Sequence, residues 1–261
     1  MGVSMRIRTL ASSSSGNCTL VSQDDTHILI DCGISMRRVT EALRALDLTP
    51  GDLSGIVMTH AHADHICGLK MMAKYHAARV FATRITGEIL CEATPELEKC
   101  MTLFDASGAI RIGPLEIRSF RTMHDAPESV GYRIEGGGKS LLFATDLGCV
   151  TREVAEAARG VDMAVIEANH DVELLRTGPY PYPLKRRILS DRGHLSNDAS
   201  AALARAIADG GARRIVLAHL SEQNNTPRLA RDTVSAALRE LGAETELAVA
   251  PARCAGEVYI I

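Results

Sequence analysis

The sequence predicts an α/β protein, and three observations support that fold class. Short apolar segments with strand character alternate with longer segments whose apolar residues recur at helical spacing along the 261 residues. Hydrophobic residues make up 46% of the chain, which is enough to bury a core. Several apolar segments end directly at Asp or His, and polar side chains at strand ends are typical of functional sites in α/β proteins.

The predicted strands are short and mostly apolar. The N-terminal part, residues 5–31, is rich in them, and the last strand there ends at Asp31. Another strand is expected near the end of the chain, over residues 257–261. The remaining strands are expected over residues 56–58, 115–120, 140–145, 162–166 and 215–218.

The predicted helices have apolar faces and recognisable ends. Thr151 and Thr226 precede two of them as N-caps, and Pro227 suits a first helical turn. Gly210 and Gly242 mark where two of them end. Helices are expected over residues 35–46, 66–75, 151–159, 197–208 and 227–241. No linker or repeat divides the chain, so a single domain over residues 1–261 is expected.

The densest chemical signal is a run of His and Asp where a predicted strand meets a predicted helix. Three imidazoles and one carboxylate lie within six residues, and their side chains can converge on a metal ion only from an irregular turn. The alternative is a chance His-rich loop, but this spacing at a strand end favours a metal site. The residues are His60, His62, Asp64 and His65.

This run resembles the His-x-His-x-Asp-His signature of the metallo-β-lactamase superfamily. The other signature points of that superfamily are matched in order, each after a predicted strand, by Asp31, His124, Asp146 and His219. The resemblance covers nearly the whole chain. It implies a four-layer αββα sandwich with metal ions at one edge of its two sheets.

The resemblance also implies a ligand set for two divalent metal ions, and this set would accept zinc, manganese or iron. The implied ligands are His60, His62 and His124 in one site, Asp64, His65 and His219 in the other, and Asp146 as a bridge between them. Two such ions can share a hydroxide and lower its pKa, and Asp64 is also expected to orient that hydroxide. Asp31 is expected to brace loops near the site without binding metal.

Two features after Asp146 narrow the chemistry to phosphodiesters. A stretch from Gly193 to Asn197 resembles the one that opens a helix in RNase Z-like nucleases and phosphodiesterases, where its His acts near the scissile phosphate. In this chain His194 holds that place, and Leu195 replaces a small polar residue. Glu167 ends the predicted strand 162–166 and is expected to orient His194 as a catalytic residue. The alternative is that Glu167 is a cap and His194 a helix-start residue.

Longer stretches resemble the bacterial YycJ/WalJ family of metallo-hydrolases, which is associated with 5′-to-3′ exonuclease activity on DNA. The resemblance implies a nucleic-acid partner, most specifically DNA, and a 5′-to-3′ DNA exonuclease that uses a hydroxide activated by two metal ions. The stretches that carry it are residues 10–18, 169–171, 182–188, 193–197 and 219–227.

A basic segment, residues 176–192, precedes His194 and is expected to contact a phosphate polymer. It contains five Lys and Arg residues and only one Asp, and its three prolines and two tyrosines are expected to interrupt regular structure. Phosphate contacts would give affinity without sequence readout, whereas an ordinary solvated surface is the alternative. The predicted substrate-binding residues are Lys185, Arg186 and Arg187, with Ser15, Asn17 and His170 elsewhere. For Ser15 and Asn17, a plain hairpin turn is the alternative.

Composition excludes several other classes. The formal net charge of −3 gives no global basic excess, and 3% aromatic residues without Trp do not favour a base-stacking platform. The seven cysteines contain no C-x-x-C pair, and neither a targeting signal nor a membrane-length apolar run is seen. We therefore expect a cytoplasmic protein with reduced thiols and no membrane partner. The sequence leaves the oligomeric state open, a homodimer included.

Two other functions stay open from the sequence. One is a small-molecule hydrolase of the same fold, acting on a cyclic phosphodiester or a thioester. The cyclic phosphodiesterase would use the same metals and His194, whereas thioester hydrolases usually add a C-terminal helical domain. The other is a non-catalytic metal-binding interaction protein, which the intact set of ligands argues against.

Overall fold

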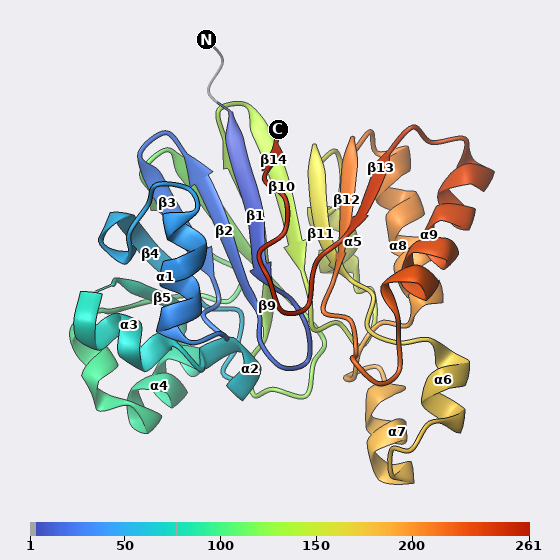
Figure 1. Cartoon of the computed structure of the whole chain (residues 1–261), viewed down its shortest axis with the longest axis horizontal. Helices are drawn as coiled ribbons and strands as arrows, with labels where there is room; N and C mark the ends of the chain where they lie inside the picture. The colour runs from blue at the N-terminus through green and yellow to red at the C-terminus, as the bar shows by residue number, and fades with distance from the viewer. Residues whose placement is uncertain (1–3, 77) are drawn as a thin grey trace.

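Two seven-stranded β-sheets pack face to face, and helices cover both outer faces (Figure 1). The computed structural model describes residues 4–76 and 78–261. The chain thus forms the predicted four-layer αββα sandwich. None of the helices within those residues is long and apolar enough to cross a membrane.

The first sheet has the order β14-β1-β2-β3-β4-β5-β6. Its N-terminal strands form an antiparallel meander, and from β3 to β6 neighbouring strands run parallel. The bounds are Met5–Ala11 for β1, Cys18–Gln23 for β2, Thr26–Ile30 for β3, Leu53–Val57 for β4, Val80–Thr83 for β5, Met101–Phe104 for β6 and Tyr259–Ile260 for β14.

The second sheet has the order β13-β12-β11-β10-β9-β8-β7. Strands β7 to β10 are antiparallel, and β10 to β13 are parallel. Both sheets are therefore mixed, which the simple strand–helix alternation did not predict. The bounds are Ala109–Ile112 for β7, Leu115–Arg121 for β8, Val130–Gly136 for β9, Lys139–Ala144 for β10, Met163–Glu167 for β11, Arg214–Ala218 for β12 and Glu246–Val249 for β13.

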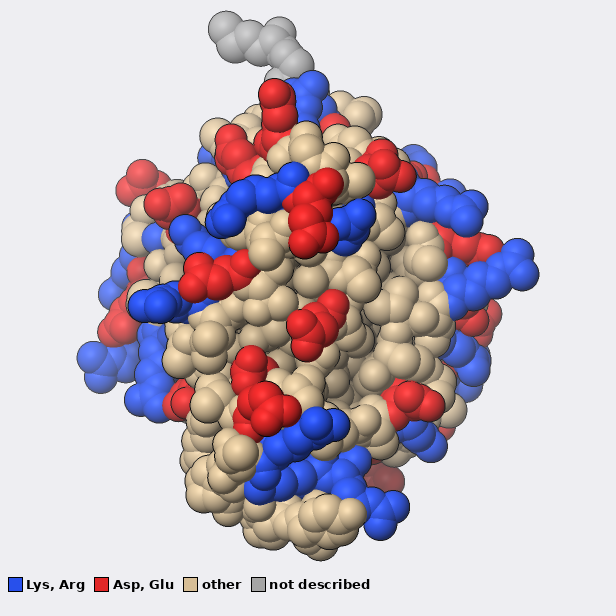
Figure 2. All heavy atoms as spheres, turned by 90° about the vertical axis from the view of Figure 1, so that its right-hand side faces the viewer, with Lys and Arg blue, Asp and Glu red and all other residues tan. Residues whose placement is uncertain are grey.

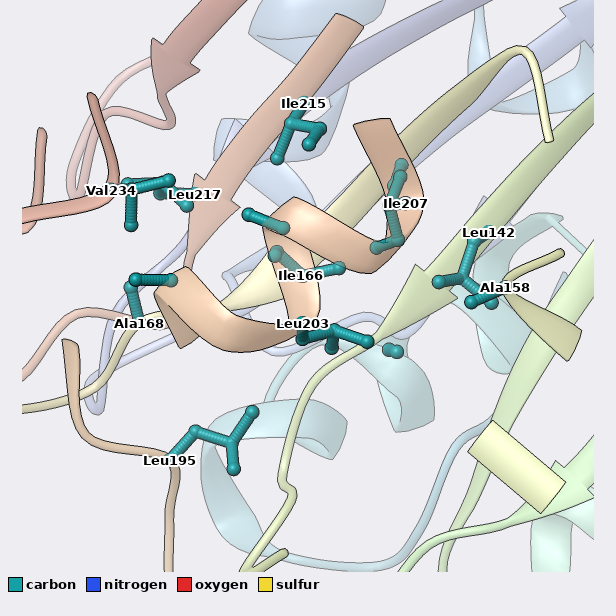
Figure 3. Packing of buried hydrophobic residues seen from close by; sticks show 14 of the residues in the cluster. Leu142, Ala158, Ile166, Ala168, Leu195, Leu203, Ile207, Ile215, Leu217 and Val234 are labelled. Carbon is teal, nitrogen blue, oxygen red and sulfur yellow. The ribbon is translucent and has the colours of Figure 1, made fainter. Parts of the chain in front are cut away.

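The central strands are mostly apolar because both of their faces are buried. Successive side chains of a strand point to opposite faces. In β10, Leu141 and Phe143 join the core between the sheets, whereas Leu142 and Ala144 join the core under the helices. Figure 3 shows this outer core, in which Leu203 of α8 (Asn197–Asp209) lies close to the strands of the second sheet.

Helices of both outer layers pack on the sheets through one apolar face each. Val39 of α1, Leu69 of α3 and Leu90 of α4 belong to the core on the first sheet, and Val154 of α5 and Val234 of α9 to the core on the second. The bounds are Met36–Arg44 for α1, Leu69–His76 for α3, Arg84–Ala93 for α4, Arg152–Ala157 for α5, Asn197–Asp209 for α8 and Pro227–Leu241 for α9. Short 3₁₀ turns span Pro50–Asp52 and Pro95–Lys99.

The five predicted helices are present with small shifts of their ends, but the one expected over residues 66–75 is broken. Ala63–Ile66 forms the short α2, and α3 begins only at Leu69. Gly68 lies between the two helices. Only glycine fits at this position, because a Cβ atom there would stand 2.1 Å from the carbonyl oxygen of Ile34. This close approach packs the His-rich turn against the segment that follows β3.

The prediction that prolines interrupt the basic segment was wrong over part of its length. Two short helices, α6 (Val172–Thr177) and α7 (Tyr182–Ile188), lie there and extend below the body of the molecule (Figure 1). Pro181 is the N-cap of α7, and Pro183 lies in its first turn. Proline is tolerated there because the first amides of a helix have no partner within it. The basic residues 185–187 are therefore helical.

Candidate metal centre

Strand ends from both sheets place the signature residues at one edge of the sandwich. Asp31 follows β3, Asp146 follows β10 and His219 follows β12. All three have left-handed backbones, with φ of 59°, 60° and 56°. Such values are uncommon for residues other than glycine, and they collect at functional sites.

The candidate ligand atoms form overlapping groups, and in each group they lie within 4.8 Å of one another. Asp146 lies between two of these groups: its Oδ1 is 3.7 Å from Nε2 of His124, and its Oδ2 is 3.5 Å from Nε2 of His65. The two oxygens of Asp146 thus face histidines of both groups. Three groups consist of predicted ligands alone, namely His60, His62 and His124; Asp64, His65 and His219; and His60, His65 and Asp146. A fourth group joins the predicted ligands Asp146 and His219 to Glu167 and His194.

Buried acceptors hold one ring nitrogen of most of these histidines. Nδ1 of His65 donates to Oδ2 of Asp31 at 2.8 Å, and Nδ1 of His124 donates to the carbonyl oxygen of Gly193 at 3.1 Å. Nδ1 of His60 lies 3.0 Å from Oγ1 of Thr59. In each ring this leaves the Nε2 lone pair turned into the site, as in metal centres where a second residue fixes the tautomer.

Asp31 holds the His-rich turn as well as His65. Its Oδ1 accepts the backbone N–H of Thr59 at 2.8 Å, and its Oδ2 accepts the hydroxyl of Thr59 at the same distance. The Asp31 side chain is completely buried and is absent from the ligand groups. The bracing role expected from the sequence is compatible with these contacts.

Two buried atoms of the predicted ligands have no hydrogen-bond partner among the described residues. They are Nε2 of His60 and Oδ2 of Asp146. A buried polar atom without a partner is costly, and a cation would satisfy both atoms. Neutral imidazoles and carboxylates are ordinary ligands of zinc, manganese and iron, so the residues present fit a divalent metal.

Burial and charge together set the protonation of the centre. Burial lowers the pKa of His60 well below its usual value, so this ring is neutral. For His65 burial opposes the charged form, but the carboxylates of Asp146 and Asp31 outweigh it and raise the pKa to about 10. In the metal-free chain the His65 ring is therefore protonated. Binding of a metal ion to this ring must release that proton.

Glu167 connects this centre to His194. The Glu167 carboxylate is fully buried at the end of β11, and its Oε1 lies 2.8 Å from Nδ1 of both His194 and His219. Its Oε2 accepts the backbone N–H groups of Leu147 at 2.9 Å and Leu195 at 3.0 Å. Burial opposes the charge of Glu167, but the two histidines outweigh it and lower the pKa to about 2.

His194 is more exposed than His60, His65, His124 and His219, but less exposed than His62, whose side chain is 34% exposed. The His194 side chain is 21% exposed, and its ring centroid lies 5.0 Å from that of His124. Burial opposes a charge on His194, but Glu167 outweighs it and raises the pKa of this ring. Leu195 contributes its backbone N–H to Glu167 and packs its side chain in the core, so the hydrogen bonding there needs no polar side chain.

The turn between β1 and β2 lies beside the centre. Nδ2 of Asn17 is 3.1 Å from Oδ2 of Asp64, and it also donates to the carbonyl oxygen of Ser13 at 2.9 Å. Oδ1 of Asn17 accepts the backbone N–H of Ser13, which fixes the amide so that its NH₂ group faces Asp64. Ser15 in the same turn is exposed. The segment is therefore a hairpin turn that also lines the site.

The other predicted substrate contacts lie at different depths. His170 is 1% exposed, and burial lowers its pKa to about 4, so its ring is buried and neutral. Lys185 donates to the carbonyl oxygen of Arg176 at 2.7 Å, and Arg186 is exposed. Figure 2 shows Lys and Arg side chains gathered at the lower end of the molecule, where Figure 1 places α6 and α7.

Asp125 is a residue of this region that the sequence analysis missed. Its Oδ1 lies 3.2 Å from Nε2 of His124, and its Oδ2 pairs with Nε of Arg187 on α7. Asp125 thus connects the basic helix to the histidines. Its position directly after His124 was the available signal.

Family comparison agrees with this geometry. The model of the "Beta-lactamase superfamily domain" matches residues 26–220. The chain belongs to the metallo-β-lactamase superfamily, and its fold and His/Asp cluster define it as a metallo-hydrolase of that class.

Two full-length relatives confirm the resemblance to the YycJ/WalJ family. The chain is 38% identical over 242 residues to exodeoxyribonuclease YycJ of Bacillus anthracis, which covers 91% of this chain and 90% of that protein. It is 36% identical over 237 residues to exodeoxyribonuclease WalJ of Streptococcus pneumoniae, with coverage of 89% and 87%. The fold is similar to that of the metallo-β-lactamase fold protein YhfI from Bacillus subtilis, with a TM-score of 0.74 at 15% identity over 99% of this chain and 100% of that one.

Proposed function

We propose that the protein is a metal-dependent phosphodiester hydrolase that digests DNA from the 5′ end. The observation that carries the proposal is the buried His/Asp centre, in which two ligand atoms have no partner within residues 4–76 and 78–261, beside a histidine held by Glu167. The names of the relatives YycJ and WalJ support DNA as the substrate. A cytoplasmic location, as expected from the sequence, fits a DNA substrate.

The proposed centre holds two divalent cations. His60, His62 and His124 would hold one, Asp64, His65 and His219 the other, and Asp146 both. When bound, such a pair of cations activates water at neutral pH and neutralises charge on the phosphate. The hydrogen bonds of Asp31 and Glu167 keep two of these rings in the tautomer that presents Nε2.

Asn17 and Asp64 would orient the attacking water. Asp64 is held by the amide of Asn17 at 3.1 Å, and the burial that would raise the pKa of Asp64 is outweighed by His219 and His65, so Asp64 is a carboxylate. Oδ2 of Asp64 lies 3.3 Å from Nε2 of His65 and 3.4 Å from Nε2 of His219, so it is the oxygen that would bind a metal ion. The Asn17 amide donates to the same Oδ2, so Oδ1 of Asp64 would stay free to accept a hydrogen bond from the attacking water.

His194 would act on the phosphate side of the centre. Glu167 holds its Nδ1, so Nε2 is the atom that can donate to a phosphate oxygen or protonate the leaving oxygen. The raised pKa of His194 favours the protonated ring, which is the form needed for both tasks. Glu167 touches no substrate in this scheme and is a positioning residue.

The basic last turn of α7 would guide the DNA strand to this site. Lys185, Arg186 and Arg187 lie in the last turn of α7, and α7 leads within six residues to His194. Contacts of such side chains with phosphates give affinity that does not depend on sequence. A small-molecule substrate has no chain of phosphates for these side chains to contact, so the basic turn favours a polymer substrate.

Digestion of end-labelled DNA and RNA, single- and double-stranded, with zinc, manganese or iron added in turn, tests the proposal. We expect shortening of DNA from the 5′ end, together with hydrolysis of bis(p-nitrophenyl) phosphate. Hydrolysis of the small ester alone, by protein with its metal content verified, would favour the small-molecule phosphodiesterase. Lack of turnover on both substrates by metal-loaded protein would favour the non-catalytic interaction protein.

A further inference from the structure

A cavity of about 180 Å³ lies between α7 and the candidate metal centre. His194 and Asp125 line it on the side of the centre, and Leu184 and Ile188 line it on the side of α7. The cavity is smaller than the ~300–1,000 Å³ of sites for drug-sized ligands. It therefore has room for one ring system next to the residue that faces the phosphate.

One wall of the cavity is apolar and partly aromatic. Tyr180 precedes α7, and Leu184 and Ile188 lie one helical turn apart on the inner face of α7. Tyr180 and Leu184 are half-buried, and Ile188 is 9% exposed. Such a wall favours a flat, weakly polar group, and aromatic side chains stack on nucleobases regardless of base identity.

The opposite wall offers one acceptor and one donor side by side. Nδ2 of Asn169 donates to the carbonyl oxygen of His219 at 2.9 Å, which leaves Oδ1 of Asn169 as an acceptor. Oγ of Ser221 accepts from the backbone and side-chain nitrogens of Asn224, which leaves the Ser221 hydroxyl hydrogen to donate. Neighbouring donors and acceptors are what the edges of nucleobases present.

The rim of the cavity carries the positive charge of Arg187. This side chain is 59% exposed and is held by Asp125, so its guanidinium stays at the entrance and keeps donors free for a phosphate. A ring in the cavity, a phosphate at Arg187 and a scissile bond at His194 would together be the parts of a single nucleotide at a strand end.

We propose that this cavity binds the unpaired base of the terminal nucleotide of the DNA strand. A base can enter only after it leaves its partner and its stacked neighbour, so the substrate engages as a frayed or single-stranded end. Since the cavity holds one ring system, the strand is shortened by one nucleotide at a time. The inference rests on the proposed function, which it extends from a substrate class to a defined position.

Binding of mononucleotides to the metal-loaded protein tests the cavity without turnover. Leu184→Trp fills the cavity, and Leu189→Trp puts the same side chain at the end of the same helix, where the leucine is 42% exposed. With dTMP and dAMP as probes in calorimetric titrations, we expect Leu184→Trp to weaken binding about 10-fold or more, on the scale of one stacked base. Leu189→Trp should bind as the unmodified protein does.

DNA with a terminal abasic residue gives the second test. For the unmodified protein, we expect KM for the abasic end to exceed that for the normal end by about 10-fold. Leu184→Trp should treat both ends alike. If Leu184→Trp loses metal or melts early, Tyr180→Ala, which removes the stacking wall, replaces it in both assays.

The outcomes separate the inference from the proposed function. If the protein digests DNA normally with equal KM for both ends, and Leu184→Trp binds mononucleotides as the unmodified protein does, the cavity does not bind the terminal base. The proposed nuclease function would then still stand. If the protein digests no DNA but Leu184→Trp still loses mononucleotide binding, the proposed nuclease function is wrong. The assignment of the cavity as a nucleotide-binding site would then still stand. Tighter binding of the matched ribonucleotide AMP than of dAMP would overturn the assignment to DNA.

Discussion

Oε1 of Glu167 lies 2.8 Å from Nδ1 of His194 and, at the same distance, accepts from the metal-site residue His219. One buried oxygen therefore orients both the candidate acid and a candidate metal ligand. The two histidines lie on different segments, one before α8 and the other after β12. Glu167 makes the geometry of the acid depend on the geometry of the centre.

Substitution of His194 by Ala should separate chemistry from metal binding. His194 is outside the predicted ligand set, so we expect metal content to be unchanged in His194→Ala. Phosphodiester turnover should fall by about 10²-fold or more, the scale of a positioned acid or base. Elemental analysis and turnover of the same preparation check both points. Equal turnover in the variant would remove His194 from the mechanism.

Glu167→Gln should damage both sites that this carboxylate holds. The carboxylate accepts four N–H groups, and an amide would turn its NH₂ against two of them. We expect a loss of about 1–3 kcal/mol in the free energy of unfolding and a decrease of about 10–100-fold in metal affinity. Denaturant unfolding and metal titration measure these effects.

The matched control for Glu167→Gln is Glu173→Gln on α6, where the side chain is 76% exposed. This control should change neither the unfolding free energy nor the metal affinity. A Glu167→Gln protein with unchanged metal affinity would show that the hydrogen bond to His219 is not needed to hold the metal.

The metal-free protein should lose stability in acid partly through Glu167. Its pKa is lowered from 4.5 to about 2 in the folded chain, so its contribution is fully present above pH 4.5 and is lost as the pH falls toward 2. The shift corresponds to about 3 kcal/mol at neutral pH. Urea unfolding of chelated protein from pH 6 downward should show a gap between the native chain and Glu167→Gln that narrows below pH 4.5. If the unfolding free energies of the two proteins change in parallel over this pH range, Glu167 does not have the lowered pKa assigned to it.

Neutral replacements on α7 should weaken polymer substrates specifically. With Lys185, Arg186 and Arg187 changed to Gln, we expect weaker DNA binding and a slope of log K against log salt that is flatter by about 0.7–0.9 per lost phosphate contact. Hydrolysis of bis(p-nitrophenyl) phosphate should be affected much less. The slope from binding titrations at several salt concentrations is the measurement.

A control with the same change of charge lies on α9. Replacement of Arg228, Arg231 and Arg239, all exposed, removes three positive charges at a different surface. The salt slope of this control should equal that of the unmodified protein. Equal slopes for both triple variants would show that α7 is no DNA contact.

Much of the centre was predictable because its residues follow strands. A strand buried on both faces reads as a continuous apolar run, so β10 and β12 could be recognised, and Asp146 and His219 with them. The His-rich turn was predictable from spacing alone. The sheet order and the antiparallel pairing of β7 to β10 could not be predicted, because an apolar run does not show which strand it pairs with.

The basic segment shows where local patterns fail. Pro181 and Pro183 indicated a loop, yet both lie at the start of α7, where a proline costs no hydrogen bond. Asp125 was missed because its partner Arg187 lies 62 residues away. The cavity beside His194 was equally hidden, since its walls come from α7, the turn after β11 and the turn after β12.

By itself, the sequence determined the kind of fold, the His/Asp set and the identity of His194 and Glu167 as a candidate pair. Only the tertiary structure decided that Glu167 also holds His219, that Asn17 faces Asp64, and that α7 closes a cavity against the centre. The physical reason is distance along the chain. Periodicity and strand ends are local properties, whereas these contacts exist only after two sheets and a helix have packed together.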